Sequence, residues 1–253
     1  MKRVVRVAAA LMFAVVGIGP VVERDVFAAG GPPMLTDDPG TVDGGDWEIN
    51  VAWIGERSAN AREDETPLVD VNYGLTENVQ VKFEMPWISD SGRSNNGFGA
   101  ANAGVKWRFF DQGEGGWQVA TYPQIEFLVP GLHHAGSDES GPRRLLPIEV
   151  QRDFGGFDAG AEIGRTFVPD SRDDGWIAGI TVGRKVSEHL ELIGELHDET
   201  VGGADTHELV LNIGARQTLS EHFTLLVSLG GDIENTIEPR NRWISYLGLQ
   251  VHL

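Results

Sequence analysis

The stretch Asn78–Trp87, NVQVKFEMPW, alternates strictly between apolar and polar side chains. Its apolar and polar residues form two separate sets: Val79, Val81, Phe83, Met85 and Trp87 against Gln80, Lys82 and Glu84. A period of two indicates a β-strand, because a helix does not place every second side chain on one face. The segment therefore predicts a strand with one apolar and one polar face.

The same alternation recurs along the rest of the chain, first in DWEINVAWI at residues 46–54. Further alternating runs lie near residues 67–74, 98–110, 117–129, 145–153, 157–167, 176–185, 190–198, 207–217, 223–231 and 243–253. With the opening stretch, these runs predict an all-β fold of about twelve strands. The last strand, YLGLQVHL, resembles the C-terminal signal that barrel-assembly machinery reads, although it ends in Leu253 and not in an aromatic residue. We therefore expect that machinery as a partner during biogenesis.

The links between the predicted strands alternate in length. Short links are expected at residues 75–78, 111–116, 153–156, 186–189 and 219–222, and longer polar links, such as 130–143, lie between them. Short periplasmic turns and longer external loops are typical of barrels in the bacterial outer membrane. The pattern therefore predicts an antiparallel up-and-down transmembrane β-barrel with both termini on the periplasmic side.

The N-terminus has the order of features found in a cleaved export signal. Basic residues at Lys2, Arg3 and Arg6 precede an apolar run over residues 7–19, and small residues surround Ala28. That run is short for a membrane-spanning helix. We predict a signal peptide at residues 1–28, an N-terminal periplasmic segment at 29–45, a barrel at 46–253 and a location in the outer membrane.

The formal charge of −18 disfavours nucleic acid as a partner, because the chain has no compact basic patch to offset it. The chain has no cysteine, so disulfides and thiolate metal ligands are excluded. A soluble lipid-binding barrel with an apolar interior is the alternative architecture. About twelve strands would enclose a lumen too wide for apolar side chains to fill, which favours a polar interior and an apolar exterior.

If the apolar set faces lipid, the charged residues of the strands face the lumen. These predicted lumen residues are Glu48, Asp70, Lys82, Glu84, Lys106, Arg108, Glu126, Glu149, Glu162, Glu191, Glu195 and Arg216, with Asp158 beside them. Carboxylates outnumber bases in this set, and rings of carboxylates favour cations in a narrow pore. The alternative is that these charges pair across the interior and leave no continuous channel.

The chain shows no convincing catalytic or metal-binding motif. It has no His-x-Ser triplet of the kind that outer-membrane hydrolases use to activate a hydroxyl. The pair His133 and His134 lacks further placed ligands, and the stretch 170–175 has an arginine at a calcium-ligand position. We therefore expect no enzyme activity, no metal and no cofactor.

The opening of the predicted mature chain, GPPMLTDDPGTVDGGDWEINVAW at residues 31–53, resembles that of the outer-membrane family named for the MetA pathway of phenol degradation. Thr36, Asp37, Asp38 and Pro39 match its opening motif, and units such as YGLTENVQVKFEMPW also resemble the family. The resemblance implies an outer-membrane barrel, loosely termed a transporter and associated with the degradation of aromatic compounds. It assigns no binding residue. From the sequence alone, the Thr36–Pro39 motif is expected to form a turn held by aspartate side chains. The alternative is a direct role of these residues in the passage of solutes.

Two functions remain from the sequence. One is a passive channel for small solutes, which could include aromatic compounds, with a net acidic lumen. The other is a structural or interaction barrel that does not conduct and whose acidic loops bridge cations to lipopolysaccharide. In both cases the expected partners are outer-membrane lipid and lipopolysaccharide, and the solute is not identified by the sequence.

Overall fold

The computed structural model describes residues 29–58, 62–90, 96–135, 142–169, 174–202, 206–236 and 242–253. The predicted signal peptide and parts of the long links lie outside these ranges. Within them, no helix is long and apolar enough to cross a membrane. The described residues form antiparallel strands in a single continuous sheet.

The sheet contains fourteen strand segments. They are β1 (Trp47–Arg57), β2 (Arg62–Thr76), β3 (Val79–Asp90), β4 (Gly97–Phe98), β5 (Ala101–Asp111), β6 (Trp117–Thr121), β7 (Gln124–Phe127), β8 (Arg143–Asp153), β9 (Asp158–Phe167), β10 (Gly175–Ser187), β11 (Leu190–Thr200), β12 (His207–Ser220), β13 (Phe223–Asn235) and β14 (Trp243–His252). Because β4 with β5 and β6 with β7 are two interrupted strands, the barrel has twelve strands. The predicted fold class and strand number are confirmed.

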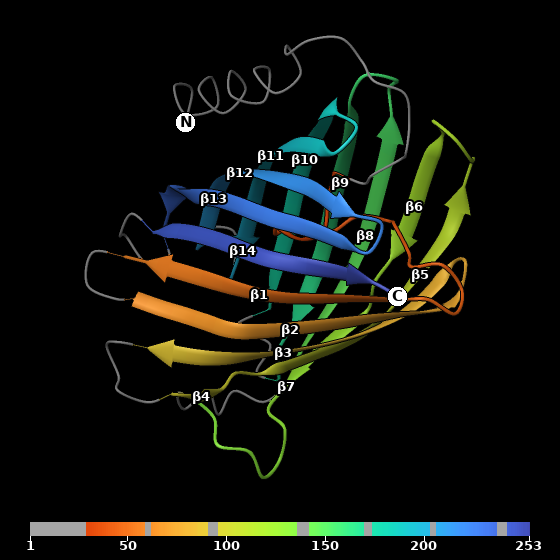
Figure 1. The fold of residues 1–253 in the computed structure, drawn as a ribbon. Coiled ribbons are helices and arrows are strands. Elements are labelled where there is room, and N and C mark those ends of the chain that lie inside the picture. Colours follow the sequence, from red (N-terminus) through yellow and green to blue (C-terminus); the bar gives the residue numbers. More distant parts are fainter. Residues whose placement is uncertain are drawn as a thin grey trace.

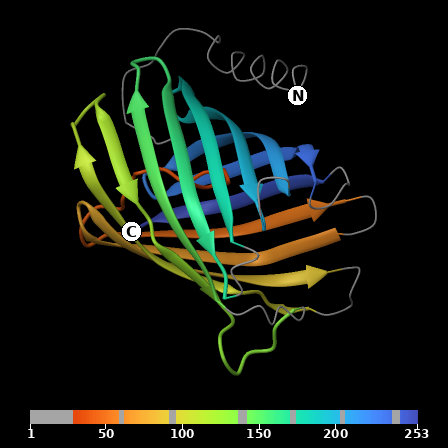
Figure 2. The ribbon, with the colours of Figure 1, turned by 180° about the vertical axis from the view of Figure 1, so that it is seen from behind.

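Pairing between the first and last strands closes the barrel. Strand β1 pairs with β14 from Glu48 opposite His252 to Arg57 opposite Trp243. In Figure 1, β1 and β14 lie side by side, and Figure 2 shows the opposite wall. Closure leaves no unpaired edge along these two strands.

The interruption between β6 and β7 falls at Tyr122 and Pro123. Proline has no backbone N–H to donate to a sheet, so a strand tends to break where it occurs. Both halves nevertheless pair with β5 on one side and with β8 on the other. The Tyr122 side chain is only 1% exposed, so the break leaves a large aromatic residue buried.

Apolar side chains cover the outside of the wall, and polar side chains are buried within the barrel. Large apolar residues such as Val105, Ile163, Ile180 and Leu229 are about half exposed. The polar residues at inward positions, among them Asn50, Glu149, Glu195 and Asn212, are almost fully buried. This arrangement agrees with the predicted apolar exterior.

Links of different length lie at the two ends of the barrel. Those at residues 77–78, 112–116, 154–157, 188–189 and 221–222 are short and define the turn end. Those at the opposite end, the loop end, are longer on the whole and reach their greatest length at 128–142, after β7. The alternation expected from the sequence is therefore present, while the compartment that each end faces stays a prediction.

Candidate functional site

The N-terminal segment, residues 29–46, enters the barrel. Figures 1 and 2 show it in red and orange, within the outline of the strands. Its residues contact side chains of β3, β5, β9, β11 and β12, so it crosses the lumen from one wall to another. The sequence assigned residues 29–45 to a periplasmic segment preceding the barrel, whereas these contacts place much of that segment against the inner wall.

Two wall carboxylates accept hydrogen bonds from the backbone of the segment. The N–H groups of Leu35 and Thr36 donate to Glu195 on β11, at 3.1 and 2.5 Å. The N–H of Asp37 donates to Oε2 of Glu162 on β9 at 3.0 Å. These N–H groups have no carbonyl acceptors on a neighbouring strand, so the two carboxylates satisfy their hydrogen bonds instead. Glu195 and Glu162 therefore act as anchors for the segment.

Two wall cations hold other parts of the segment. Nζ of Lys106 on β5 donates to Oδ1 of Asp37 at 2.8 Å and to the Asp38 carbonyl at 2.5 Å. The Arg216 guanidinium on β12 donates to the backbone carbonyls of residues 30–32. Charge-assisted bonds of this kind are stronger than neutral ones. The segment is thus held by anions at its N–H groups and by cations at its acceptors.

Glycines in the wall make room for the segment. A Cβ at Gly179 on β10 would overlap the Thr36 side chain, and one at Gly214 on β12 would overlap the end of Met34. The three atoms nearest to the Cβ position of Gly179 all belong to Thr36. Because Gly179 has no side chain, Thr36 can pack directly against the backbone of β10.

The expected turn at Thr36–Pro39 is also present. The Asp38 N–H donates to Oδ1 of Asp37 at 2.8 Å, and the Gly40 N–H donates to Oδ1 of Asp38 at 2.6 Å. These are the local side-chain to backbone bonds that aspartate forms in turns. The same Asp37 side chain also pairs with Lys106, so the motif both shapes the turn and fixes it to the wall.

The segment lies between two cavities. The turn-side cavity has a volume of about 500 Å³ and is lined by Asp37, Asp38, Glu48, Asp70, Lys82, Tyr122 and their neighbours. The loop-side cavity has a volume of about 370 Å³ and is lined by Leu35, Glu126, Ile177, Glu199, Arg242 and their neighbours. The two cavities share no lining residue. The segment therefore lines both cavities, with Asp37 and Asp38 on the turn side and Leu35 on the loop side.

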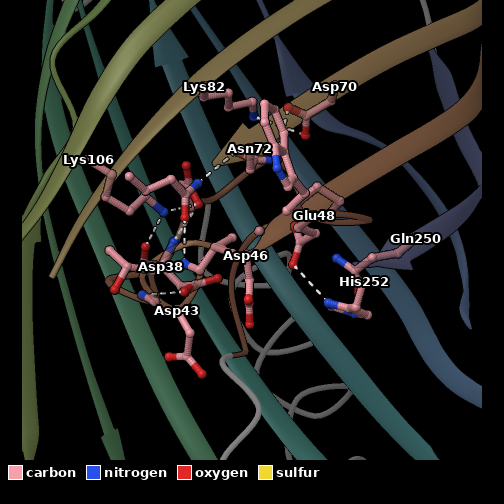
Figure 3. A pocket seen from close by; sticks show the side chains of 18 of the residues that line it. Asp38, Asp43, Asp46, Glu48, Asp70, Asn72, Lys82, Lys106, Gln250 and His252 are labelled. Atoms are coloured by element: carbon pink, nitrogen blue, oxygen red, sulfur yellow. Dashed lines mark hydrogen bonds and ion pairs between the residues drawn. The ribbon is translucent and has the colours of Figure 1, made fainter. Parts of the chain in front are cut away.

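Charged side chains surround the turn-side cavity in Figure 3. Lys82 and Lys106 lie on one side of it, and Glu48, Gln250 and His252 lie on the other. Nζ of Lys106 lies 5.2 Å from the centre of the Tyr122 ring, close enough for a cation–π contact. The cavity thus contains both signs of charge around one buried aromatic ring.

The structure places the twelve predicted lumen residues in three settings. Five line the turn-side cavity and one the loop-side cavity: Glu48, Asp70, Lys82, Lys106 and Arg216, and Glu126. Glu162 and Glu195 anchor the segment, as described above. The remaining four form ion pairs with neighbouring side chains: Glu84 with Lys82, Glu149 with Lys106, Glu191 with Arg216, and Arg108 with Asp111.

The sequence predicted an N-terminal segment at residues 29–45, but not that it enters the barrel or which wall residues hold it. Thr36 is fully buried, and its Oγ1 lies 3.2 Å from Nδ1 of His197 on β11. The inward aliphatic residues of the loop-side cavity, which include Leu145, Val210 and Ile244, were also not expected in a polar lumen. The available signal was an N-terminal stretch rich in Gly, Pro and Asp, with no strand period, that leads directly into β1.

The two histidines of the pair His133 and His134 lie in different environments: His133 is exposed, and His134 is partly buried. Both ring nitrogens of His134 are within hydrogen-bonding distance of carbonyls, those of Phe98 and Val129, at 3.2 and 2.9 Å. This places His134 in a structural role in the link that precedes β8. Among the described residues, no group of three or more potential ligands could hold a metal ion.

Comparison with known proteins identifies the fold. No protein-family model and no curated protein matches the chain. Its structure is similar to that of the COG4313 outer membrane channel from Pseudomonas putida F1, with a TM-score of 0.65 and 12% identity over 85% of this chain and 98% of that one. It is also similar to the NanC porin, with a TM-score of 0.61 and 10% identity over 81% and 100% of the two chains.

A third similar structure is the KdgM porin, with a TM-score of 0.54 and 11% identity over 80% of this chain and 98% of that one. All three similar proteins are outer-membrane channels or porins by name. At these identities the likeness shows a shared fold, the closed twelve-stranded antiparallel barrel.

Proposed function

We propose that this protein is an outer-membrane channel for small solutes whose lumen is constricted by its own N-terminal segment. The observation that carries the proposal is the pair of cavities, of about 500 and 370 Å³, on either side of that segment. A barrel whose only task was mechanical would have no need of internal space lined by placed charges. The similarity in fold to channels and porins supports the same role.

The lining of the loop-side cavity supports small solutes with an apolar body and a polar group. Leu35, Leu145, Ile177, Val210 and Ile244 supply an aliphatic surface, and charged residues surround it. Leu35 is 43% exposed even though it lies inside the barrel. A volume of about 370 Å³ lies within the range of small-molecule sites. Aromatic compounds, which the family resemblance implies, fit this description.

Recording in planar lipid bilayers tests the proposal. The purified barrel is expected to conduct in discrete steps, and a small amphipathic aromatic such as phenol is expected to reduce the current while it occupies the loop-side cavity. Absence of any current from a folded, inserted barrel would favour the alternative of a structural barrel that does not conduct.

We also propose that the open pore prefers cations, because carboxylates outnumber bases around the turn-side cavity. The sequence suggested Glu84, Glu191 and Glu195 as the first residues to neutralise. Glu195 anchors the segment and Glu191 pairs with Arg216, so changing them would alter the constriction as well as the charge. Asp43, Asp46 and Glu48 are better targets, because they line the cavity and their side chains form none of the anchoring bonds described above.

The triple variant Asp43→Asn, Asp46→Asn and Glu48→Gln is expected to lose most of the cation preference. The effect should be largest at low salt, where the screening length is longest. The measurement is the reversal potential in a salt gradient, with Glu114→Gln in the exposed turn before β6 as the control for lost charge. An unchanged reversal potential in the triple variant would exclude these carboxylates as the selectivity determinants.

A further inference from the structure

Two arginines interrupt the apolar outer surface near the loop end of the barrel. Arg144 on β8 follows the outward parity of Leu146 and Ile148, which are 52% and 45% exposed. Arg165 on β9 follows the outward parity of Ile163 and Phe167, which are 55% and 40% exposed. Both guanidinium groups therefore leave the wall on its apolar side, where charge is uncommon.

The sheet register makes these two arginines diagonal neighbours. Arg144 lies opposite Phe167, and Arg165 lies opposite Leu146, two residues along each strand. Diagonal neighbours of this kind have their Cα atoms about 7–8 Å apart, within reach of long side chains. Two guanidinium groups can therefore approach a single anionic headgroup from adjacent strands.

Aromatic and aliphatic side chains frame this pair. The Arg165 guanidinium lies 5.1 Å from the Trp176 ring centre and 5.9 Å from that of Phe167. Ile125 on β7 lies opposite Arg144. Asp174 pairs with Arg165 at 3.3 Å and offsets one of the two positive charges. Arg144 leaves the described side chains of this patch with a net positive charge.

The position of the pair along the wall fits a headgroup layer. On β8, Arg144 and Arg152 lie eight residues apart, with Leu146 and Ile148 exposed between them. Eight residues span about 27 Å along a strand, or about 20 Å along the membrane normal at a tilt of about 40°. Arginine side chains extend outward from such positions to reach the polar layer. The apolar band between the two arginines thus approaches the height of about 25 Å typical of outer-membrane barrels.

We propose that Arg144 and Arg165 form a binding site for the phosphate groups of lipid A, the lipid portion of lipopolysaccharide. This inference rests on the proposed outer-membrane location and on an external loop end. Lipid A carries two phosphates on a disaccharide, so each of the two arginines can pair with a phosphate of its own. A lipid with one phosphate can form only one such pair. Guanidinium groups bind phosphate oxygens through two parallel hydrogen bonds. Trp176 and Phe167 supply apolar contacts for the adjoining acyl chains.

The opposite end of the same surface provides a matched control. Arg152 lies 5.4 Å from the Trp117 ring centre and 5.3 Å from that of Phe154, near the turn end. It has the same combination of arginine and aromatic rings, but at the end assigned to the periplasmic leaflet. Loss of Arg152 should leave binding of lipid A unchanged.

The experiment measures lipid binding to the intact, folded barrel by native mass spectrometry, with lipid A, dephosphorylated lipid A and phosphatidylglycerol as the probes. Wild type is expected to bind lipid A most tightly. The double variant Arg144→Gln, Arg165→Gln is expected to bind it at least about tenfold more weakly, which corresponds to about 1.4 kcal/mol. Arg152→Gln is expected to match wild type.

Three outcomes would overturn the site: equal binding by the double variant, equal binding of dephosphorylated lipid A, or wild-type preference for phosphatidylglycerol. Heat-modifiable migration on gels confirms folding, and the double lysine variant, which keeps the charge but loses the paired hydrogen bonds, is expected to bind with intermediate affinity. A folded barrel that binds lipid A at this site without conducting would contradict the channel proposal alone. Failure of the wild type to insert into lipid would contradict the outer-membrane location.

Discussion

Gly179→Leu is expected to raise the single-channel conductance several-fold. A side chain at this position on β10 would occupy the space of the Thr36 side chain, whose atoms are the three nearest to the added Cβ. The substitution should therefore unseat the N-terminal segment and join the turn-side and loop-side cavities into one pore. Planar-bilayer recording at fixed voltage and salt provides the measurement.

A matched glycine on the next strand separates this effect from added bulk in the lumen. Gly160 on β9 also faces inward, but its Cβ would meet Thr181 of the wall and not the segment. Gly160→Leu is expected to leave the conductance near that of wild type or slightly lower. A similar rise in both variants would show that the wall, and not the segment, had changed.

Deletion of residues 30–42 provides the second test of the same idea. The deletion variant should conduct at least as well as Gly179→Leu. Adding Gly179→Leu to it should raise the conductance no further, because both changes remove the same obstacle, the N-terminal segment. If the deletion variant folds and conducts no better than wild type, then the segment does not limit the flow.

The wall of this barrel could be predicted from the sequence because its pattern is local. Alternation in a strand such as Asn78–Trp87 depends only on the pleat, which sends successive side chains to opposite faces. Turn and loop lengths are equally visible in a single chain. The division of charged residues between lumen and exterior follows from the same parity, as the burial of Glu149 and Glu195 illustrates.

The content of the lumen could not be predicted, because it depends on contacts between distant residues. Thr36 and Glu195 are 159 residues apart, and nothing in the local sequence of either indicates the other. The aspartates at 37 and 38 form a turn with their neighbours, as their local pattern predicts. Their bonds to Lys106 depend on the closed barrel, which brings β5 beside the segment.

These contacts give the excess of carboxylates in the lumen a second role, which is to bind the N-terminal segment. Glu162 and Glu195 accept hydrogen bonds from the segment backbone, so we expect them to hold the segment in place and to contribute little to the attraction of cations. The segment brings four aspartates of its own, at positions 37, 38, 43 and 46, and no basic residue. Its aspartates therefore join the wall carboxylates Glu48 and Asp70 around the turn-side cavity, and the charge of the pore is expected to depend on whether the segment is in place.

Ile213→Arg is expected to destabilise the folded barrel in lipid by about 2–4 kcal/mol, because a charged side chain near the bilayer midplane loses hydration that lipid cannot replace. Ile213 lies at the middle of β12, is 44% exposed on the apolar face, and pairs with Leu229, which is 55% exposed. Leu219, near the turn end of the same strand, is 57% exposed, and Leu219→Arg should cost only about 0–1 kcal/mol since it lies near the interface. Reversible denaturant unfolding in vesicles measures both free energies. Equal costs at the two positions would place the centre of β12 outside the hydrocarbon layer and contradict the membrane orientation on which the channel proposal depends.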